Sequence, residues 1–411
     1  MSAPRAIVIV GGGQGGLEVA AALRAGGYDG AVTIVGEEPG LPYERPPLSK
    51  GLLAGEQSAA DATLRPEPFF GEQAIELLRG RRATSIDRDR RRVELDDATS
   101  LRYDHLVLAT GARNRELELA GVELDGVVGL RTLADALELR ERLTRAQSVV
   151  IVGAGFIGLE VASVAAKAGL EVTVIEAQPR PMTRTTTAET AAFFSAAHAR
   201  NGVRLLLGGA LRAIHGSAGR AIGVEDAEGG NHPADVVLLA VGIVPNDELA
   251  AAAGLPVAHG ILVDEHLRTA DPAISAIGDC ARFPSRLWES PVLLESVQNA
   301  ADQAHAVAAR ITGAGTPYAA VPWFWSDQAG VRLQLAGRTA DAQQTVLSGD
   351  PAGGRFSTLC FRAGRLCGVE SVGRTGDHVA ARRLLAGSDP DLSPAAAAAA
   401  GFELKAYARS R

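Results

Sequence analysis

The chain has 411 residues, 46% of them hydrophobic and 22% charged, and a formal net charge of −7 at pH 7. This length allows two or three domains with substantial cores, and the composition is typical of a globular protein. The acidic balance argues against nonspecific nucleic-acid binding, and the eight histidines and three cysteines show neither metal-ligand spacing nor a disulfide framework.

A strand is predicted at residues 7–10, so close to the N-terminus that we expect no signal peptide. No apolar run reaches the length of a membrane span. We therefore expect a cytoplasmic protein with no bound metal and no membrane or nucleic-acid partner.

The first strand opens a glycine-rich unit that ends at Glu37. Its strand, glycine turn and second strand are expected at residues 7–10, 11–16 and 32–35, with a helix after the turn that extends to about residue 25. In the motif Gly11-x-Gly13-x-x-Gly16, the first glycine makes the turn, the second lets backbone approach a pyrophosphate, and the third lets helix and strand pack closely. The helix N-terminus offers N–H groups and a positive dipole end to phosphates. The unit predicts a dinucleotide site.

A proline-rich loop follows, with four prolines between residues 39 and 47, and leads into a short helix near Leu48. It presents Arg45 and Lys50 at the carboxyl end of the predicted sheet, where ligands of α/β proteins bind. Residues 81–103 predict a small antiparallel meander. The arginine-rich run within it is interleaved with aspartates, so we interpret it as a solvated hairpin.

The next buried strand is expected at residues 105–109 and ends at Thr110-Gly111, where backbone could touch a cofactor. A helix follows with Thr132 as N-cap and Asp135 three residues later, the pattern of a capping box.

Residues 148–176 then repeat the glycine-rich unit. The motif is Gly153-x-Gly155-x-x-Gly158, followed by a helix to about Ala168 and a strand ending at Glu176, which would accept hydrogen bonds from a ribose diol. Two complete units in one chain imply two dinucleotides.

Further elements complete the chain. Strands are expected at residues 203–206 and 236–240, a crossover at 241–246, a strand pair within 261–279, and a long helix at 295–311. From about Pro317 an aromatic cluster opens a region with strands at 333–336, 356–361 and 366–369, a helix at 376–385, and an alanine run at 395–400 that forms a surface helix or loose tail. The predicted class is α/β, with two Rossmann-like dinucleotide-binding domains and an α+β C-terminal domain.

Seven strings appear in an order that resembles the FAD-dependent NADH:ferredoxin reductases of bacterial cytochrome P450 and ring-hydroxylating dioxygenase systems, a family that includes putidaredoxin reductase. The strings are GGGQGG at 11–16, RPPLSK at 45–50, ATG at 109–111, GAGFIGLE at 153–160, AIGDC at 276–280, ESVQNA at 295–300 and PWFWSDQ at 322–328. RPPLSK and PWFWSDQ are the specific ones. The resemblance implies an FAD-binding domain at 1–114 and 245–318, an inserted NAD-binding domain at 115–244 and a C-terminal domain at 319–411.

The resemblance assigns FAD to the first unit, with Glu37 on the adenosine ribose, Asp279 on the ribityl chain and the helix beginning at Val297 facing the flavin ring. Trp325 is assigned to the isoalloxazine, although it could equally be a core aromatic. The residues assigned to FAD are Gly11, Gly13, Gly15, Gly16, Glu37, Arg45, Lys50, Ala83, Ala109, Thr110, Gly111, Arg131, Asp279, Val297 and Trp325.

The second unit would bind NADH, since Glu176 would repel the 2′-phosphate of NADPH, although Arg180 and Arg184 leave some NADPH use possible. Glu160 would face the nicotinamide side, paired with Lys50. The residues assigned to NADH are Gly153, Gly155, Ile157, Gly158, Glu176 and Gly242, and those assigned to hydride transfer are Lys50, Glu160 and Trp325.

The implied partner is a [2Fe–2S] ferredoxin and, through it, a P450 or oxygenase. Six arginines at 310, 332, 338, 374, 382 and 383 are candidates for its docking, or ordinary surface residues. Two alternatives stay open: a reductase of rubredoxin, quinone or another acceptor, and an NADH-responsive flavoprotein with an interaction role. Because no cysteine precedes Cys280, the thiol chemistry of disulfide reductases is not expected, and Cys360 and Cys367 are interpreted as packing residues.

Overall fold

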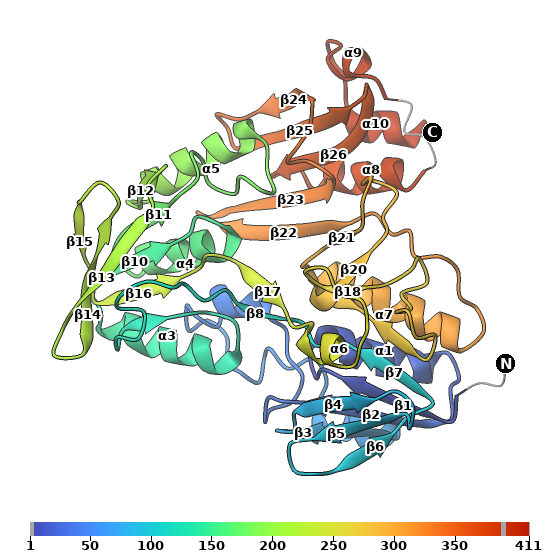
Figure 1. Ribbon diagram of the computed structural model, residues 1–411. Helices are drawn as coiled ribbons and strands as arrows, with labels where there is room; N and C mark the ends of the chain where they lie inside the picture. Colours follow the sequence, from blue (N-terminus) through green and yellow to red (C-terminus); the bar gives the residue numbers. More distant parts are fainter. Residues whose placement is uncertain (1–3, 388–391, 411) are drawn as a thin grey trace. The chain divides into compact units, whose positions relative to one another are not determined.

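The computed structural model describes residues 4–387 and 392–410. The chain divides into two compact units (Figure 1), and each combines segments that are far apart in the sequence. The first unit comprises Met1–Glu44, Ala62–Arg113 and Ile243–Pro322, and the second comprises Arg45–Asp61, Asn114–Gly242 and Trp323–Arg411.

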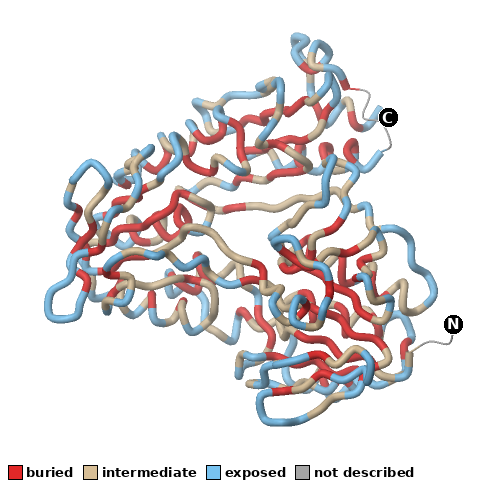
Figure 2. The backbone as a smooth tube through the Cα atoms, viewed as in Figure 1, coloured by how far each residue is buried: buried red, intermediate tan, exposed pale blue. Residues whose placement is uncertain are grey.

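The first unit is built on a five-stranded parallel sheet in the order β19-β7-β1-β2-β3. These strands are β1 (Ala6–Val10), β2 (Ala31–Gly36), β3 (Ile75–Arg79), β7 (His105–Leu108) and β19 (Ile274–Ala276). Helices α1 (Gln14–Ala25) and α7 (Val297–Ile311) pack against each other. Branched residues suit β1 because it lies between β2 and β7 and four of its five residues are buried (Figure 2).

Smaller elements complete this unit. They are α2 (Glu67–Glu72), α6 (Glu248–Ala252), the 3-10 turn η2 (Gly278–Cys280), the paired crossover strands β8 (Ala112–Asn114) and β17 (Ile243–Pro245), the meander β4 (Ala83–Asp87), β5 (Arg92–Leu95) and β6 (Ser100–Arg102), and the sheet of β18 (Ile261–Leu262), β20 (Ala281–Phe283) and β21 (Val292–Leu293). The predicted meander is confirmed.

Two expectations for this unit are corrected. The strands expected within residues 261–279 are not a pair, because β18 pairs with β20 and β19 pairs with β7. The arginine-rich hairpin is also not solvated throughout, since Arg88 Nε lies 3.0 Å from Asp271 Oδ2. Both corrections depend on contacts between distant parts of the chain, which a local pattern does not report.

The second unit contains a parallel sheet in the order β12-β11-β10-β16-β9. Its strands are β9 (Val127–Val128), β10 (Ser148–Val152), β11 (Glu171–Glu176), β12 (Arg204–Leu207) and β16 (Val236–Leu239). Its helices are α3 (Leu133–Arg145), α4 (Phe156–Lys167) and α5 (Ala188–Arg200), and an antiparallel hairpin sheet follows, formed by β13 (Leu211–Ser217), β14 (Arg220–Asp226) and β15 (Asn231–Pro233). The repeated glycine-rich unit therefore folds as predicted.

The same unit holds a five-stranded antiparallel sheet in the order β22-β23-β26-β25-β24. Its strands are β22 (Trp323–Gln328), β23 (Val331–Gly337), β24 (Gln344–Asp350), β25 (Arg355–Arg362) and β26 (Arg365–Val372), accompanied by α8 (Thr375–Ala386), α9 (Pro394–Ala397), α10 (Leu404–Arg409) and the 3-10 turn η1 (Pro46–Ser49). Two strands of this sheet, β22 and β24, were missed by the sequence analysis. The aromatic cluster forms β22, and β24 is a largely exposed edge strand with a weak apolar pattern. The alanine run contributes only the short helix α9.

The predicted fold class is confirmed: the chain has two parallel, Rossmann-like sheets and an α+β C-terminal region. The three-domain boundaries stay a prediction. None of the helices in residues 4–387 and 392–410 combines the length and apolar character that a membrane span requires.

The capping box at Thr132 allows a direct test of local stability. The Thr132 hydroxyl accepts from the Asp135 N–H, and the Asp135 carboxylate accepts from the Thr132 N–H. Thr132→Ala should lower the free energy of unfolding by about 1 kcal/mol in urea denaturation, because the Asp135 N–H in the first turn loses its side-chain acceptor. Thr144→Ala, at an exposed position in the last turn of α3, is the matched control and should be close to neutral. Equal effects of both changes would contradict the capping role.

Candidate functional site

The first and third glycines of each motif are required by close backbone contacts. Gly11 and Gly153 have φ of +123° and +103°. An added Cβ would lie 2.0 Å from Ala109 O at Gly11 and 2.4 Å from Ala240 O at Gly153. The third glycines are Gly16 in α1 and Gly158 in α4. An added Cβ would lie 1.9 Å from Gly11 O at Gly16 and 2.2 Å from Gly153 O at Gly158. The two glycine-rich motifs therefore share one geometry, in which only glycine fits at the first and third positions.

The middle glycines are different, because an added Cβ at Gly13 or Gly155 would meet no atom within 4 Å. The protein itself therefore leaves room for a side chain at both positions. Each is the N-cap of its helix and offers no side chain to the first turn, whereas α3, α5 and α7 are capped by Thr132, Thr187 and Ser296. The start of α1 and of α4 therefore has the open, amide-lined form that fits a dinucleotide pyrophosphate.

A glutamate lies at the end of the second strand of each glycine-rich segment, Glu37 in the first and Glu176 in the second, and the two carboxylates have different surroundings. The Glu176 carboxylate accepts from Ala154 N at 2.7 Å and from Gln178 N at 2.8 Å, so it is oriented toward the glycine turn. The Glu37 side chain is 75% exposed and lies 3.9 Å from Arg82 Nε. Glu176 is thus preorganised, and Glu37 is accessible to a ligand.

The predicted binding residues are divided between the two compact units of the fold. The first unit contains Gly11, Gly13, Gly15, Gly16, Glu37, Ala83, Ala109, Thr110, Gly111, Asp279 and Val297. The second contains Arg45, Lys50, Arg131, Gly153, Gly155, Ile157, Gly158, Glu160, Glu176, Gly242 and Trp325. Within the second, Arg45 donates to the Arg131 carbonyl at 2.5 Å, so two predicted residues from distant segments meet. Their individual roles toward a cofactor stay predictions.

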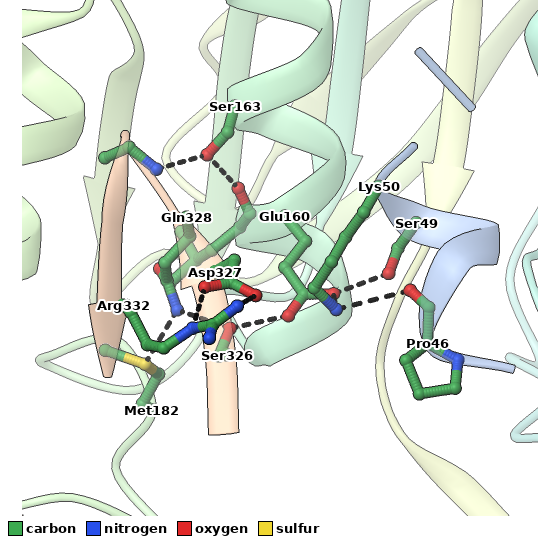
Figure 3. Close-up of polar contacts among 12 residues, drawn as sticks. Pro46, Ser49, Lys50, Glu160, Ser163, Met182, Ser326, Asp327, Gln328 and Arg332 are labelled. Carbon is green, nitrogen blue, oxygen red and sulfur yellow. Dashed lines mark hydrogen bonds and ion pairs between the residues drawn. The ribbon is translucent and has the colours of Figure 1, made fainter. Parts of the chain in front are cut away.

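The carboxylate of Glu160 on α4 is buried in the second unit, where the residue is 2% exposed (Figure 3). Its Oε2 lies 2.7 Å from Lys50 Nζ and accepts from Ser49 Oγ at 2.5 Å. Its Oε1 accepts from Ser326 Oγ at 2.6 Å. The predicted pairing of Glu160 with Lys50 is confirmed. A buried carboxylate is tolerated when an opposite charge and further donors satisfy it, and all these donors are present.

Sequence reasoning missed four residues that are joined to Glu160 by hydrogen bonds: Ser49 and Ser326 directly, Gln328 through Ser326, and His198 through Gln328. Three of them lie in the two most specific strings, RPPLSK and PWFWSDQ, and that was the available signal. Strand periodicity also points to them, because alternate residues of β22 face opposite sides. Ser326 and Gln328 are buried on the side facing α4. Phe324 is half-buried on the same side, and its ring packs edge-on against the Phe156 ring with 4.8 Å between the centroids.

The other side of β22 carries Trp323 and Trp325, whose rings stack at 5.8 Å with an interplanar angle of 29°. The Arg382 guanidinium lies 4.3 Å from the centroid of the Trp323 ring. Trp325 is half-buried. Its proposed role beside the flavin stays a prediction.

Most of the candidate docking arginines have partners within the protein. Arg332, Arg338 and Arg374 form ion pairs with Asp327, Asp341 and Asp377. Arg310 donates to Ser275 Oγ at 2.6 Å, and burial lowers the pKa of its guanidinium. Arg310 is therefore integrated into the first unit rather than presented on its surface.

Comparison with known proteins identifies this architecture. The model of the pyridine nucleotide-disulphide oxidoreductase family matches residues 5–304. The chain belongs to this family. A second family model, described as a reductase C-terminal domain, matches residues 323–408.

Individual relatives agree with this assignment over nearly the whole chain. Rhodocoxin reductase of Rhodococcus erythropolis is 50% identical over 399 residues, covering 97% of this chain and 93% of the relative. The crystal structure of a ferredoxin reductase for the CYP199A2 system from Rhodopseudomonas palustris has a TM-score of 0.96 at 46% identity, covering 98% of this chain and 100% of that one.

The structure of the covalent putidaredoxin reductase–putidaredoxin complex has a TM-score of 0.95 at 37% identity and covers both chains completely (100% each). The resemblance to FAD-dependent ferredoxin reductases that the sequence motifs indicated is confirmed.

A substitution at Gly155, the middle glycine of the second motif, tests ligand binding without disturbing the fold. Gly155→Ala should leave the melting temperature close to that of the wild type, because the new methyl group meets no protein atom. The affinity for NADH should fall by about tenfold or more, because the methyl occupies the space where a pyrophosphate approaches the backbone. Gly158→Ala is the contrasting change and should destabilise the fold through the contact with Gly153 O. Unchanged NADH binding by a folded Gly155→Ala protein would contradict the assignment.

The cysteines generate a second prediction. Burial raises the pKa of the Cys280 and Cys360 thiols and raises that of Cys367 to about 11. A chromogenic disulfide reagent at about pH 8 should therefore react slowly with the native protein, because the thiolate is the reactive form. All three thiols should react at once after unfolding in guanidinium, which is the control. One fast-reacting thiol in the native state would contradict the structural role of these residues.

Proposed function

We propose that this protein is an NADH-dependent flavoprotein reductase that passes electrons from NADH through FAD to a [2Fe–2S] ferredoxin serving a P450 or oxygenase. The observation that carries the proposal is the duplicated glycine turn, with its open helix N-termini, in a chain 50% identical to rhodocoxin reductase. The putidaredoxin reductase–putidaredoxin complex supports a ferredoxin as the partner.

The two glycine turns divide the binding task. In this proposal, the N-terminus of α1 binds the FAD pyrophosphate, Glu37 binds its adenosine ribose, and Asp279 binds the ribityl chain. The N-terminus of α4 binds NADH, and Glu176 repels the 2′-phosphate of NADPH. The domain assignment goes with it: residues 1–114 and 245–318 for FAD, 115–244 for NADH, and 319–411 as a C-terminal domain.

Bound FAD supplies the chemistry that the chain lacks, because flavin accepts a hydride and releases electrons singly. The protein contributes binding and orientation. Lys50 and Glu160 would act at the nicotinamide side as a fixed pair of opposite charges, with Trp325 beside the isoalloxazine. The three free cysteines are not needed as nucleophiles, and burial raises the pKa of each.

We also propose a cytoplasmic location. NADH is regenerated there, and the reducing environment would keep the three free thiols reduced.

Rapid mixing of the FAD-loaded protein with NADH under anaerobic conditions tests the first half of the proposal. The flavin absorbance should bleach in a single turnover, and NADPH should be slower by about tenfold or more because of Glu176. An equal rate with both nucleotides would contradict the specificity assigned to Glu176. Absence of bleaching would contradict the proposal as a whole.

Steady-state reduction of cytochrome c tests the second half, with and without an added [2Fe–2S] ferredoxin. The rate should depend on ferredoxin concentration and be low without it. Rubredoxin and a quinone are the matched alternative acceptors. A higher rate with either of them would replace the ferredoxin assignment. A slow, long-lived charge-transfer complex that reduces no acceptor would indicate an interaction role instead.

A further inference from the structure

A continuous chain of hydrogen bonds within the second unit runs from a buried histidine on α5 to Glu160 on α4. His198 Nε2 lies 2.9 Å from Gln328 Oε1, Gln328 Nε2 lies 3.1 Å from Ser326 Oγ, and Ser326 Oγ lies 2.6 Å from Glu160 Oε1. All four residues are at most 2% exposed. The chain thus joins two helices of the parallel-sheet region through one strand of the antiparallel sheet.

The direction of every bond in this chain follows from its last member. An ionised carboxylate only accepts, so Ser326 must donate its single hydroxyl hydrogen to Glu160. Ser326 Oγ can then accept from the amide nitrogen of Gln328, and that orientation turns the amide oxygen toward His198. His198 must therefore carry its proton on Nε2.

Two further observations agree with this direction. Gln328 Nε2 has a second acceptor, Met182 Sδ at 3.6 Å, which fits a nitrogen rather than an oxygen at that position (Figure 3). His198 Nδ1 is buried and makes no hydrogen bond, as expected for an unprotonated ring nitrogen. Burial also lowers the pKa of His198, which keeps the ring neutral.

We propose that Gln328 is a positioning residue that acts through Ser326 to hold the Glu160 carboxylate in a single orientation against Lys50, and that this orientation sets the rate of the NADH step. The inference rests on the proposed function, since it concerns the same NADH-binding region. Gln328 itself does not touch Glu160.

The physical reason lies in how the carboxylate is shared. Lys50 and Ser49 both engage Oε2, and Ser326 alone engages Oε1 among the bonds given above. Without a donor at Oε1 the carboxylate can rotate about its last torsion, since a terminal sp³–sp² torsion has broad minima. Gln328 keeps the Ser326 hydroxyl aimed by occupying its acceptor side. Losing Gln328 thus releases Ser326, and Glu160 after it.

Gln328→Met is the informative substitution, because methionine has a similar volume and no donor. Anaerobic mixing of the FAD-loaded variant with NADH should show a limiting rate of flavin reduction about tenfold below that of the wild type, the size expected when the charge-assisted hydrogen bond from Ser326 to Glu160 is lost. Asp327→Asn is the matched control on the same strand. Its side chain pairs with Arg332 at 2.7 Å and takes no part in the chain, so its rate should equal that of the wild type.

A double-variant cycle separates positioning from general structural support. If Gln328 acts only through Glu160, then Gln328→Met should have no further effect on the rate when it is added to Glu160→Ala. Gln328→Met should likewise have no further effect on the rate in a Ser326→Ala background, which keeps the test usable if Glu160→Ala does not fold. A wild-type rate for Gln328→Met, or an equal loss in all backgrounds, would overturn the proposal.

A second readout needs neither NADH nor turnover. Nitrogen NMR of histidine-labelled, FAD-loaded protein reports which ring nitrogen of His198 carries the proton. The wild type should show the Nε2–H tautomer, and Glu160→Ala should show a mixture of tautomers, because the group that imposes the direction is gone. A wild-type Nδ1–H tautomer would overturn the directional chain. Failure of NADH to bleach the wild-type flavin would instead reject the proposed function and leave this measurement valid.

Discussion

The close contact between the backbone of the glycine turn and the helix that follows it determines how each dinucleotide unit is built. In α1 the carbonyl of Gly11 lies where the Cβ of any other residue at position 16 would be, and in α4 the carbonyl of Gly153 takes the corresponding place at position 158. A helix can start that close to its strand only if both surfaces lack side chains. Its first turn then points into open space instead of into a capping side chain.

The second organising feature is the buried ion pair of Glu160 and Lys50. A desolvated carboxylate is costly unless its oxygens are satisfied, and here the donors come from two segments that are distant in the sequence: Ser49 and Lys50 at the end of the turn η1, and Ser326 on strand β22. The pair therefore connects the proline-rich loop and the C-terminal sheet to helix α4 within the second unit. Because the donors engage both carboxylate oxygens, this arrangement favours a single orientation of the Glu160 side chain.

A second buried carboxylate in the same unit, that of Glu370, accepts hydrogen bonds from uncharged donors, whereas Glu160 pairs with Lys50. Glu370 on β26 accepts from the backbone N–H and the hydroxyl of Thr187, the N-cap of α5, at 2.8 Å and 2.7 Å. Burial raises the pKa of Glu370. It anchors the start of the helix that carries His198, so the antiparallel sheet contacts α5 at its first residues through Glu370 and further along through Gln328. The C-terminal sheet therefore helps to position helix α5.

The amino-acid sequence by itself determined the features that short segments specify: both glycine turns, the strands on either side of them, the capping box at Thr132, and the packing role of the cysteines. These depend on backbone sterics, local hydrogen bonds and burial patterns within about thirty residues. The family resemblance added the pairing of Lys50 with Glu160. Only the tertiary structure decided the rest: the separation of β18 from β19, the edge strand β24, and the contact of Ser326 with Glu160 across 166 positions. Such contacts join distant segments, and a pattern within one segment carries no record of its partner.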